Sequence, residues 1–350
     1  MISAAYEQKP WIAIVGGFLG AGKTTLILAA AKELERRGIR SAVILNDQGN
    51  ELVDTGYATH NGMQSGEVTG GCFCCKLSDL LRVMGELRAH QPHVIFAEPV
   101  GSCTDISATI LHPLLEYRDE FRLVPFTVLV DPERARALLA DDADPDLRFL
   151  FHQQLQEADL VCCTKSDLYP DCPQISAQHV RQVSARTGQG VAAWLDEIFS
   201  GNLSVGNEIL DIDYERYARA EAALAWLNLQ VTIEPSVPQS PAVMLGPLLY
   251  HLDREFTRNH VTIVHLKAII DSPTGFLKAA MCSNGQEPAV EGALDASPAS
   301  RHELLLNLRA VGSAQQVRDI VERELDQIDG KLTSLHMDCF HPLRPSRNVA

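Results

Sequence analysis

The chain has 350 residues, and 45 acidic against 30 basic side chains give it a formal net charge of −15. A length of this order accommodates two domains with substantial cores. The acidic balance argues against general binding to nucleic acid or to anionic membranes, which attract basic surfaces. No apolar run is long enough to span a bilayer and no signal-peptide pattern opens the sequence, so the expected location is the cytoplasm.

A glycine-rich motif follows the first predicted strand. The apolar run Ile12–Val15 is followed by Gly17-x4-Gly22-Lys23-Thr24 and then by a segment rich in Ala and Leu. The order strand, glycine-rich turn, helix is that of the phosphate-binding loop (P-loop), whose backbone N–H groups enclose phosphate oxygens. We predict that Lys23 contacts the β- and γ-phosphates and that the Thr24 hydroxyl ligates Mg²⁺. The predicted nucleotide-binding residues of this loop are Gly17, Gly20, Ala21, Gly22, Lys23, Thr24 and Thr25.

A polar stretch, Asn46–Asp54, follows the second predicted strand, Ser41–Asn46, and has almost nothing to bury. A loop at this place in a P-loop protein can reach the metal ion and the γ-phosphate. We predict that Asp54 contacts Mg²⁺, with a solvated loop as the alternative.

The third predicted strand, His93–Ala97, ends in an acid followed by x-x-Gly, namely Glu98-Pro99-Val100-Gly101. In P-loop GTPases the acid of such a motif holds a metal-bound or attacking water, and the glycine N–H contacts the γ-phosphate. The predicted catalytic residues are therefore Lys23, Glu98 and Gly101.

A base-recognition motif follows the predicted strand Leu160–Cys163. The segment Thr164-Lys165-Ser166-Asp167 is similar to the guanine-reading Asn-Lys-x-Asp motif, with Thr in the Asn position. The Asp167 carboxylate can accept hydrogen bonds from N1–H and N2–H₂ of guanine, and the Lys165 stem can cover the ring. The later stretch SARTG, which begins at Ser184, matches the loop that supports the base from the other side. The predicted base-binding residues are Thr164, Lys165, Asp167, Ser184 and Ala185.

Three of the nine cysteines stand together in Gly70-Gly71-Cys72-Phe73-Cys74-Cys75. Cysteines in a chain with a P-loop point to reduced thiols, and clustered thiols more often mean metal than disulfide. We predict that Cys72, Cys74 and Cys75 bind Zn²⁺ or another transition metal, with a further ligand from elsewhere. Packing of small buried side chains and a redox pair are the alternatives. Cys103 lies close in sequence, and we favour a small buried side chain over a further ligand.

The predicted fold class is α/β: a P-loop NTPase domain with a mainly parallel sheet, followed by a smaller α+β domain. Alternating residues from Leu227 to Ile233 predict a strand with one wet face, and Ser313 with Gln316 predicts a helix start. His336, Cys339 and His341 near the end could bind metal weakly, but an extended, docked or frayed terminus is favoured. The predicted divisions are a P-loop domain over 10–200, a linker over 201–220, the second domain over 221–330 and a tail over 331–350.

The motifs GGFLGAGKTT, the Asp54 loop, GCFCC, EPVG, TKSD and SARTG together resemble the CobW-type metallochaperone GTPases, relatives of the GTPases that insert nickel into urease and hydrogenase. The resemblance covers residues 10–200. It implies a GTPase with a Cys-x-Cys-Cys metal site, a smaller domain behind it, and a role in cobalamin or zinc handling. Three departures mark a distinct branch: Asn50 where many relatives have an acid, Thr164 for Asn, and PVGSCTD after Glu98.

The sequence therefore predicts a slow Mg²⁺-dependent GTPase that couples GTP binding and hydrolysis to the binding of a transition metal and its transfer to a client metalloprotein. Zinc is the favoured metal. Slow hydrolysis is expected because no arginine finger can be assigned. Two alternatives remain: a GTP-dependent chaperone for a cobalamin- or other metal-dependent enzyme with a structural Cys cluster, and a P-loop small-molecule kinase. No nucleic-acid or membrane partner is expected. A nucleotide- or metal-dependent homodimer is left open.

Overall fold

The computed structural model describes residues 9–47, 53–206 and 208–342, and the chain divides into two compact units. Among the described residues, the first unit comprises 9–47, 58–206 and 208–220, and the second comprises 53–57 and 221–342. The chain therefore enters the second unit twice, once for a short segment after the second strand and once for the whole C-terminal part.

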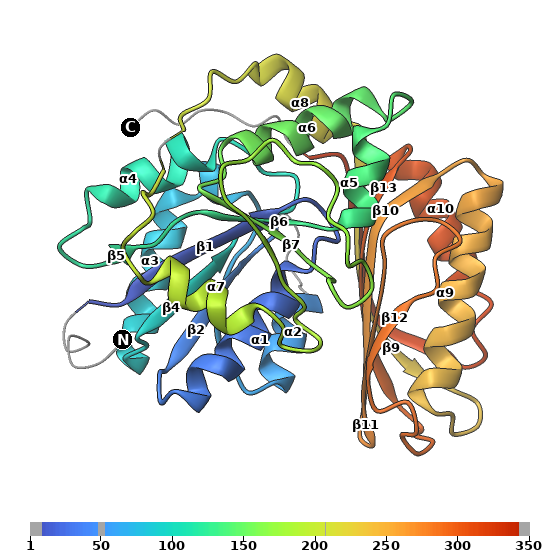
Figure 1. Cartoon of the computed structure of the whole chain (residues 1–350). Helices are drawn as coiled ribbons and strands as arrows, with labels where there is room; N and C mark the ends of the chain where they lie inside the picture. Colours follow the sequence, from blue (N-terminus) through green and yellow to red (C-terminus); the bar gives the residue numbers. More distant parts are fainter. Residues whose placement is uncertain (1–8, 48–52, 207, 343–350) are drawn as a thin grey trace. The chain divides into compact units, whose positions relative to one another are not determined.

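The first unit is built on a parallel sheet in the order β3-β2-β4-β1-β6-β7-β8, with β5 beside the start of β1 (Figure 1). The strands in chain order are β1 (Trp11–Gly17), β2 (Ser41–Asn46), β3 (Gln64–Val68), β4 (Val94–Glu98), β5 (Arg122–Leu123), β6 (Thr127–Val130), β7 (Leu160–Cys163) and β8 (Val180–Gln182). Every pairing is parallel, so the carboxyl ends of the strands meet at one edge of the sheet.

Helices lie on both faces of this sheet, as Figure 1 shows. They are α1 (Lys23–Arg36), α3 (Leu77–Leu87), α4 (His112–Leu115), α5 (Pro132–Leu139), α6 (Pro145–Gln156) and α7 (Val191–Ile198), with short turns of helix η1 (Phe73–Cys75), η2 (Arg88–His90) and η3 (Ser107–Leu111). Strand β1 is buried on both faces because its apolar run packs against these helices.

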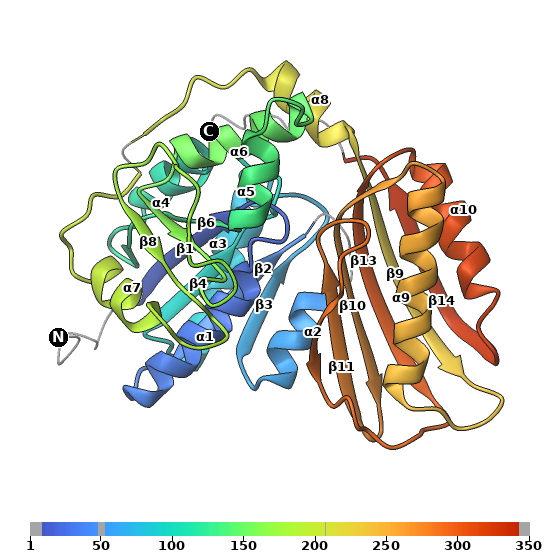
Figure 2. The ribbon, with the colours of Figure 1, turned by 45° about the vertical axis from the view of Figure 1, so that its right-hand side comes forward.

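The second unit is built on an antiparallel sheet in the order β12-β11-β10-β13-β9-β14. Its strands are β9 (Leu224–Glu234), β10 (Thr262–Ser272), β11 (Gly275–Met281), β12 (Ala289–Gly292), β13 (His302–Val311) and β14 (Lys331–Phe340). Helices α9 (Pro241–Arg258) and α10 (Ala314–Leu325) cover one face of this sheet (Figure 2) and close an apolar core with it. Helix α2 (Val53–His60) begins in this unit, and α8 (Tyr214–Ala222) leads into it. The predicted fold class is confirmed.

The C-terminal segment differs from its prediction. Residues 331–340 of the predicted tail form β14, in which eight residues pair with β9 and the register shifts between Thr333 and His336, so the tail assignment is wrong there. The physical reason is burial: Leu332, Met337 and Cys339 pack against the apolar core under α10. The extended terminus, which the sequence favours over weak metal binding, is docked as this strand: His336 contacts Asp338, and the Cys339 thiol donates to the Ala314 carbonyl.

The prediction of a wet face on β9 is also wrong. The side chains of Leu227 and Val231 point into the apolar core, but Asn228 and Thr232 on the other face are buried as well, at 6% and 1% exposure. Asn228 Oδ1 accepts hydrogen bonds from Asn307 and from Arg309, both on β13. A strand with hydrogen-bonded polar side chains on its second face shows the same alternation as a strand that faces water.

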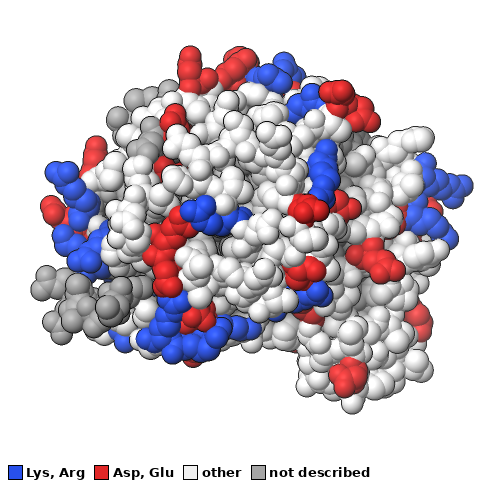
Figure 3. Space-filling model, in the orientation of Figure 1, with Lys and Arg blue, Asp and Glu red and all other residues white. Residues whose placement is uncertain are grey.

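Basic and acidic side chains lie beside one another on the face of the molecule drawn in Figure 3. Among the described residues, no helix combines the length and the apolar character needed to cross a membrane.

Candidate nucleotide and metal site

The P-loop lies at the carboxyl end of β1, between that strand and α1. Gly17 ends the strand with φ at 129°, and a Cβ at this position would stand 2.4 Å from the carbonyl oxygen of Leu129 on β6. Only glycine fits so close to a neighbouring backbone. The turn that follows is closed by a hydrogen bond from Ala21 N to Phe18 O.

Lys23 and Thr24 occupy the first turn of α1 and face the loop and the neighbouring strand. Lys23 is 7% exposed, and its Nζ donates to the carbonyl oxygen of Gly17 at 2.9 Å. The Thr24 hydroxyl donates to Oε1 of Glu98 at 3.1 Å, so the helix is joined to the end of β4. A hydroxyl and a carboxylate at this distance are the hard oxygen ligands that suit Mg²⁺. Thr25, further round the same turn, is half-buried.

Gly101 lies against the P-loop, as expected of a residue that senses the γ-phosphate. A Cβ built on Gly101 would be 3.0 Å from Lys23 Nζ and 2.8 Å from the Leu19 side chain. The carbonyl of Gly101 accepts a hydrogen bond from Gln154 Nε2 on α6 at 3.0 Å, which holds the segment in place. Any side chain here would press against the Lys23 ammonium group.

Asp54 differs from its prediction in local structure. Residues 48–52 of the predicted loop lie outside the described residues, whereas Asp54 itself lies in α2, so the loop assignment is wrong at this residue. Its Oδ2 forms an ion pair with Lys267 Nζ on β10 at 2.6 Å, and both side chains are largely buried. The preceding Val53 N–H donates to Asn307 Oδ1 on β13, so the segment is anchored to the second sheet. The Mg²⁺ role of Asp54 stays a prediction.

The Asp167 carboxylate is held from two sides. Oδ1 accepts from the Ser184 hydroxyl at 2.6 Å, and Oδ2 forms an ion pair with Arg186 at 2.5 Å. The Ser184 hydrogen bond, followed by the Arg186 guanidinium, lowers the pKa of Asp167 below its ordinary value. Asp167 is thus ionised and positioned as an acceptor, while the exposed Arg186 side chain can move aside. Ala185 lies between these two partners in the chain.

Thr164 braces the base-recognition motif against the P-loop. Its hydroxyl lies 2.9 Å from the Ala21 carbonyl oxygen and 3.2 Å from that of Val130. The threonine therefore links the motif to the phosphate loop although Asn is the commoner residue. Lys165 has φ at 55°, and its Nζ pairs with Asp131 Oδ2 at 2.5 Å.

One cysteine pair differs from the expectation of reduced thiols. Cys163, at the end of β7, forms a disulfide with Cys172, and the Cα atoms are 6.1 Å apart. The bond closes the stretch that contains the base-recognition motif.

The cysteine motif folds into a compact turn. The Sγ atoms of Cys72, Cys74 and Cys103 all lie within 4.8 Å of one another, and all three residues are buried. Cys75, which is half-buried, places its Sγ 3.5 Å from that of Cys72 and 3.8 Å from that of Cys74. Among the described residues, Cys72, Cys74 and Cys103 form the one group of His, Cys, Asp and Glu side chains that is spaced to hold a metal ion. Cys103 is the small buried side chain that we expected, and its thiol also lies in this group, so a ligand role stays open as well.

The neighbouring thiols shift the pKa values of Cys72 and Cys74 in opposite directions. Hydrogen bonds from Cys103, and then from Cys74 and Cys75, hold the pKa of Cys72 well below its ordinary value. The pKa of Cys74 is raised well above it by the neighbouring Cys103, Cys72 and Cys75 thiols and by burial. The cluster thus favours one thiolate and opposes a second, unless a cation compensates the added charge.

Asn46 holds the cysteine turn, and sequence reasoning missed this role. Its Nδ2 donates to the carbonyl oxygens of Val68 and Gly71, and its Oδ1 accepts from Phe73 N–H at 2.8 Å. Asn46 is the last residue of β2, so the turn is tied to the carboxyl edge of the sheet where the P-loop lies. The sequence offered one signal for this role, an Asn at the end of a predicted strand, but the residues that Asn46 contacts are more than twenty positions away in the chain.

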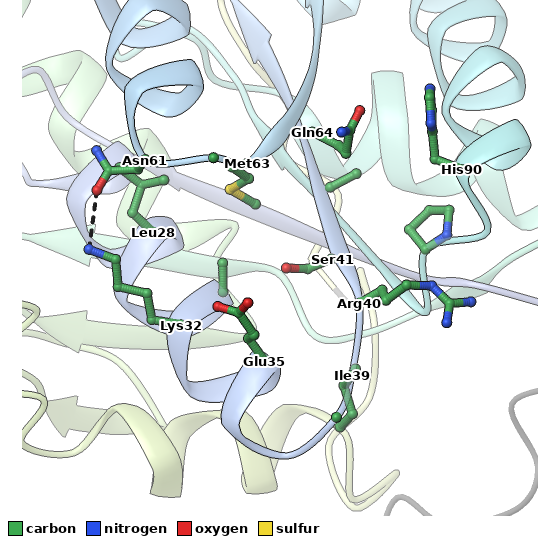
Figure 4. Close-up of a pocket in the computed structure, with 15 residues that line it drawn as sticks. Leu28, Lys32, Glu35, Ile39, Arg40, Ser41, Asn61, Met63, Gln64 and His90 are labelled. Atoms are coloured by element: carbon green, nitrogen blue, oxygen red, sulfur yellow. Dashed lines mark hydrogen bonds between the residues drawn. The ribbon is translucent and has the colours of Figure 1, made fainter.

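A cavity of about 370 Å³ lies at the opposite edge of the same sheet (Figure 4). It is lined by α1 and by the residues that precede or begin β2, β3 and β4, and Lys32 Nζ donates to Asn61 Oδ1 at its rim. None of the motif residues lines it. The nucleotide site is therefore defined by the loops at the carboxyl edge and not by this cavity.

The fold and these loops define a P-loop nucleotide-binding protein. A family model described as CobW/HypB/UreG, nucleotide-binding domain, matches residues 11–190, more than half of the chain. The chain belongs to the CobW/HypB/UreG family, which confirms the resemblance carried by its motifs.

Curated relatives match across the same part of the chain. The zinc chaperone CobW of Sinorhizobium sp. is 29% identical over 211 residues, which cover 53% of this chain and 58% of the relative. The zinc chaperone YeiR of Escherichia coli K12 is 28% identical, over 44% of this chain and 46% of the relative. The chain spans about half the length of these relatives. Among solved structures, Zn(II)-bound YjiA GTPase from E. coli aligns over 90% of this chain and 99% of that chain, with 15% identity and a TM-score of 0.38.

Proposed function

We propose that this protein is a Mg²⁺-dependent GTPase that couples GTP binding and hydrolysis to the binding of zinc and its transfer to a client metalloprotein. The observation that carries the proposal is the proximity in one unit of a P-loop and a buried thiol cluster, with Asn46 tying the cluster to the carboxyl edge of the sheet. The curated relatives described as zinc chaperones support zinc as the cargo.

Each motif residue has a part in this function. Lys23 leaves the Gly17 carbonyl to contact phosphate, where its charge stabilises the negative charge that builds up in the transition state. Thr24 and Glu98 supply oxygen ligands for Mg²⁺, which neutralises phosphate charge when bound. Gly101 contacts the γ-phosphate through its N–H, a role that its position close to the Lys23 ammonium supports.

A second candidate keeps GTP binding but makes the cysteine cluster structural, in a chaperone for a cobalamin- or other metal-dependent enzyme. The burial of Cys72 and Cys74, at 5% and 6% exposure, favours it, because a buried ion exchanges slowly with solvent. The two candidates differ in whether nucleotide state changes metal affinity.

The decisive measurement is zinc affinity by competition with a chelator, first with GDP and then with a non-hydrolysable GTP analogue, with Mg²⁺ and reductant present. Metal delivery requires the two affinities to differ by at least about tenfold, which equals about 1.4 kcal/mol of coupling; the analogue's affinity must then change by the same factor on adding zinc. Cys74→Ser is the control that should lose affinity in both states. Parent affinities equal within twofold would favour the structural cluster.

A further inference from the structure

The cysteine cluster draws its thiols from two separate segments. Cys74 and Cys75 lie in the η1 turn and Cys72 directly precedes it, whereas Cys103 follows β4 and comes two residues after Gly101. Although Cys103 is far from the other three cysteines in the sequence, its Sγ lies within 4.8 Å of the Sγ atoms of both Cys72 and Cys74.

Five of the six spacings among the four sulfur atoms are close to those of a single metal site, and Cys75 and Cys103 must approach each other for both to bind one ion. In a tetrahedral zinc site with bonds of about 2.3 Å, the sulfur atoms are about 3.8 Å apart. The two contacts of Cys75, at 3.5 and 3.8 Å, already have this length. The contacts among Cys72, Cys74 and Cys103 fall within 4.8 Å, so modest side-chain rotation brings them to it. Cys103 is 4% exposed, as deeply buried as Cys72 and Cys74.

The segment that carries Cys103 is also the one that meets the P-loop. Gly101 stands against Lys23, and Gln154 Nε2 donates to the carbonyl oxygens of both Gly101 and Cys103, at 3.0 and 2.9 Å. The Cys103 N–H donates to the Val100 carbonyl at 2.9 Å, which makes the segment a tight turn. A shift of Gly101 on contact with a γ-phosphate therefore moves Cys103 with it, since the two share one turn and one clamp.

We propose that Cys103 is the fourth ligand of a Cys72–Cys74–Cys75–Cys103 metal site and that it carries the nucleotide dependence of metal affinity. The inference rests on the proposed function, because it takes the bound metal as the cargo. Binding forms four metal–sulfur bonds and releases the thiol protons to solvent without any change of oxidation state. Cys103 shares a turn with Gly101, whereas the other three cysteines belong to a different segment of the chain.

The test compares two variants that each remove one thiol from the same cluster. Cys103→Ser and Cys75→Ser are each expected to lower zinc affinity at least about tenfold in the GDP state. Only Cys103→Ser should bring the affinities with GDP and with the GTP analogue to within twofold of each other, while Cys75→Ser keeps the parent ratio. Cys282→Ser, which changes a cysteine of the second unit, should behave as the parent does.

Cobalt(II) supplies a readout that does not depend on nucleotide. The sulfur-to-cobalt charge-transfer band of the parent should show four thiolates, and that of Cys103→Ser three, with Cys103→Ala as a second variant should the serine variant fail to fold. A three-thiolate parent spectrum, or parent-like zinc affinity in Cys103→Ser, overturns the proposal while the function stands. A parent that binds no zinc overturns the proposed function itself, and Cys103 as a ligand with it.

Discussion

At the scale of single residues, we expect base recognition to depend on the Asp167 carboxylate. Ser184 and Arg186 already hold it ionised, so both oxygens are acceptors before any nucleotide enters. Guanine presents N1–H and N2–H₂ on one edge, and adenine has no such pair of donors. We therefore predict that Asp167 selects guanine over adenine because both of its oxygens accept hydrogen bonds.

Replacing Asp167 with Asn should weaken GTP binding by roughly 2–4 kcal/mol, because the amide NH₂ faces a donor of guanine. Xanthosine triphosphate, whose O2 accepts instead of donating, should then bind better than GTP. The measurement is nucleotide affinity of parent and variant by titration calorimetry. Equal binding of GTP and ATP by the parent would remove the guanine assignment.

At the scale of elements, the segment after β4 rests on a buried carboxyl group. The side chain of Glu157, just after α6, is 1% exposed and accepts hydrogen bonds from the Thr104 hydroxyl and from Ser107 N–H. Burial raises its pKa from 4.5 to about 8, against the smaller opposite effect of these hydrogen bonds. The Gly101–Cys103 turn continues into this support, so its stability depends on pH.

The direction of this pH dependence follows from the number of protons that Glu157 binds in the folded and unfolded states. Between about pH 4.5 and 8 the folded protein keeps a proton on Glu157 that the unfolded chain releases, so this group's contribution to stability falls as pH rises through that window. From pH 6 to pH 8 the parent should lose about 2–3 kcal/mol relative to Glu157→Gln, which carries no titratable group there. Urea unfolding at both pH values gives the difference, and identical pH slopes would contradict it.

At the scale of the whole molecule, residues far apart in the chain meet in the second unit. Asp54 pairs with Lys267 across 213 residues, and Tyr57 packs its ring beneath the Lys278 ammonium. The start of α2 thus belongs to the same unit as the second sheet, whereas β2 belongs to the nucleotide-binding unit.

Two variants separate the roles of Asp54. Breaking the ion pair by Lys267→Met or by Asp54→Asn should cost about 1–3 kcal/mol of unfolding free energy, since each leaves a largely buried partner without its charge. If Asp54 also contacts Mg²⁺, as predicted, only Asp54→Asn should in addition raise the Mg²⁺ concentration needed for GTP hydrolysis. An unchanged Mg²⁺ requirement would leave Asp54 with the structural role alone.

The local motifs were predictable from the sequence because each is a contiguous pattern with its own physics. The P-loop glycines, the acid and glycine after β4, and the apolar runs of the parallel strands determine loops and strands wherever they stand in a chain. The fold class and the family followed from their order. The predictions of a tail over 331–340 and of a solvent-exposed face on β9 were wrong, because the elements packed beside a strand decide whether its polar face is buried.

What the tertiary structure decided is which distant residues meet. Cys103 joined the cysteine turn only because β4 and β2 are neighbours in the sheet, and Asp54 found Lys267 only because α2 lies on the second sheet. Asn46, Gln154 and Thr164 act through carbonyl groups that no pattern of residue types reveals. A sequence states which chemical groups are available, but partners separated by tens or hundreds of residues are chosen by strand order and burial, which emerge from the whole chain.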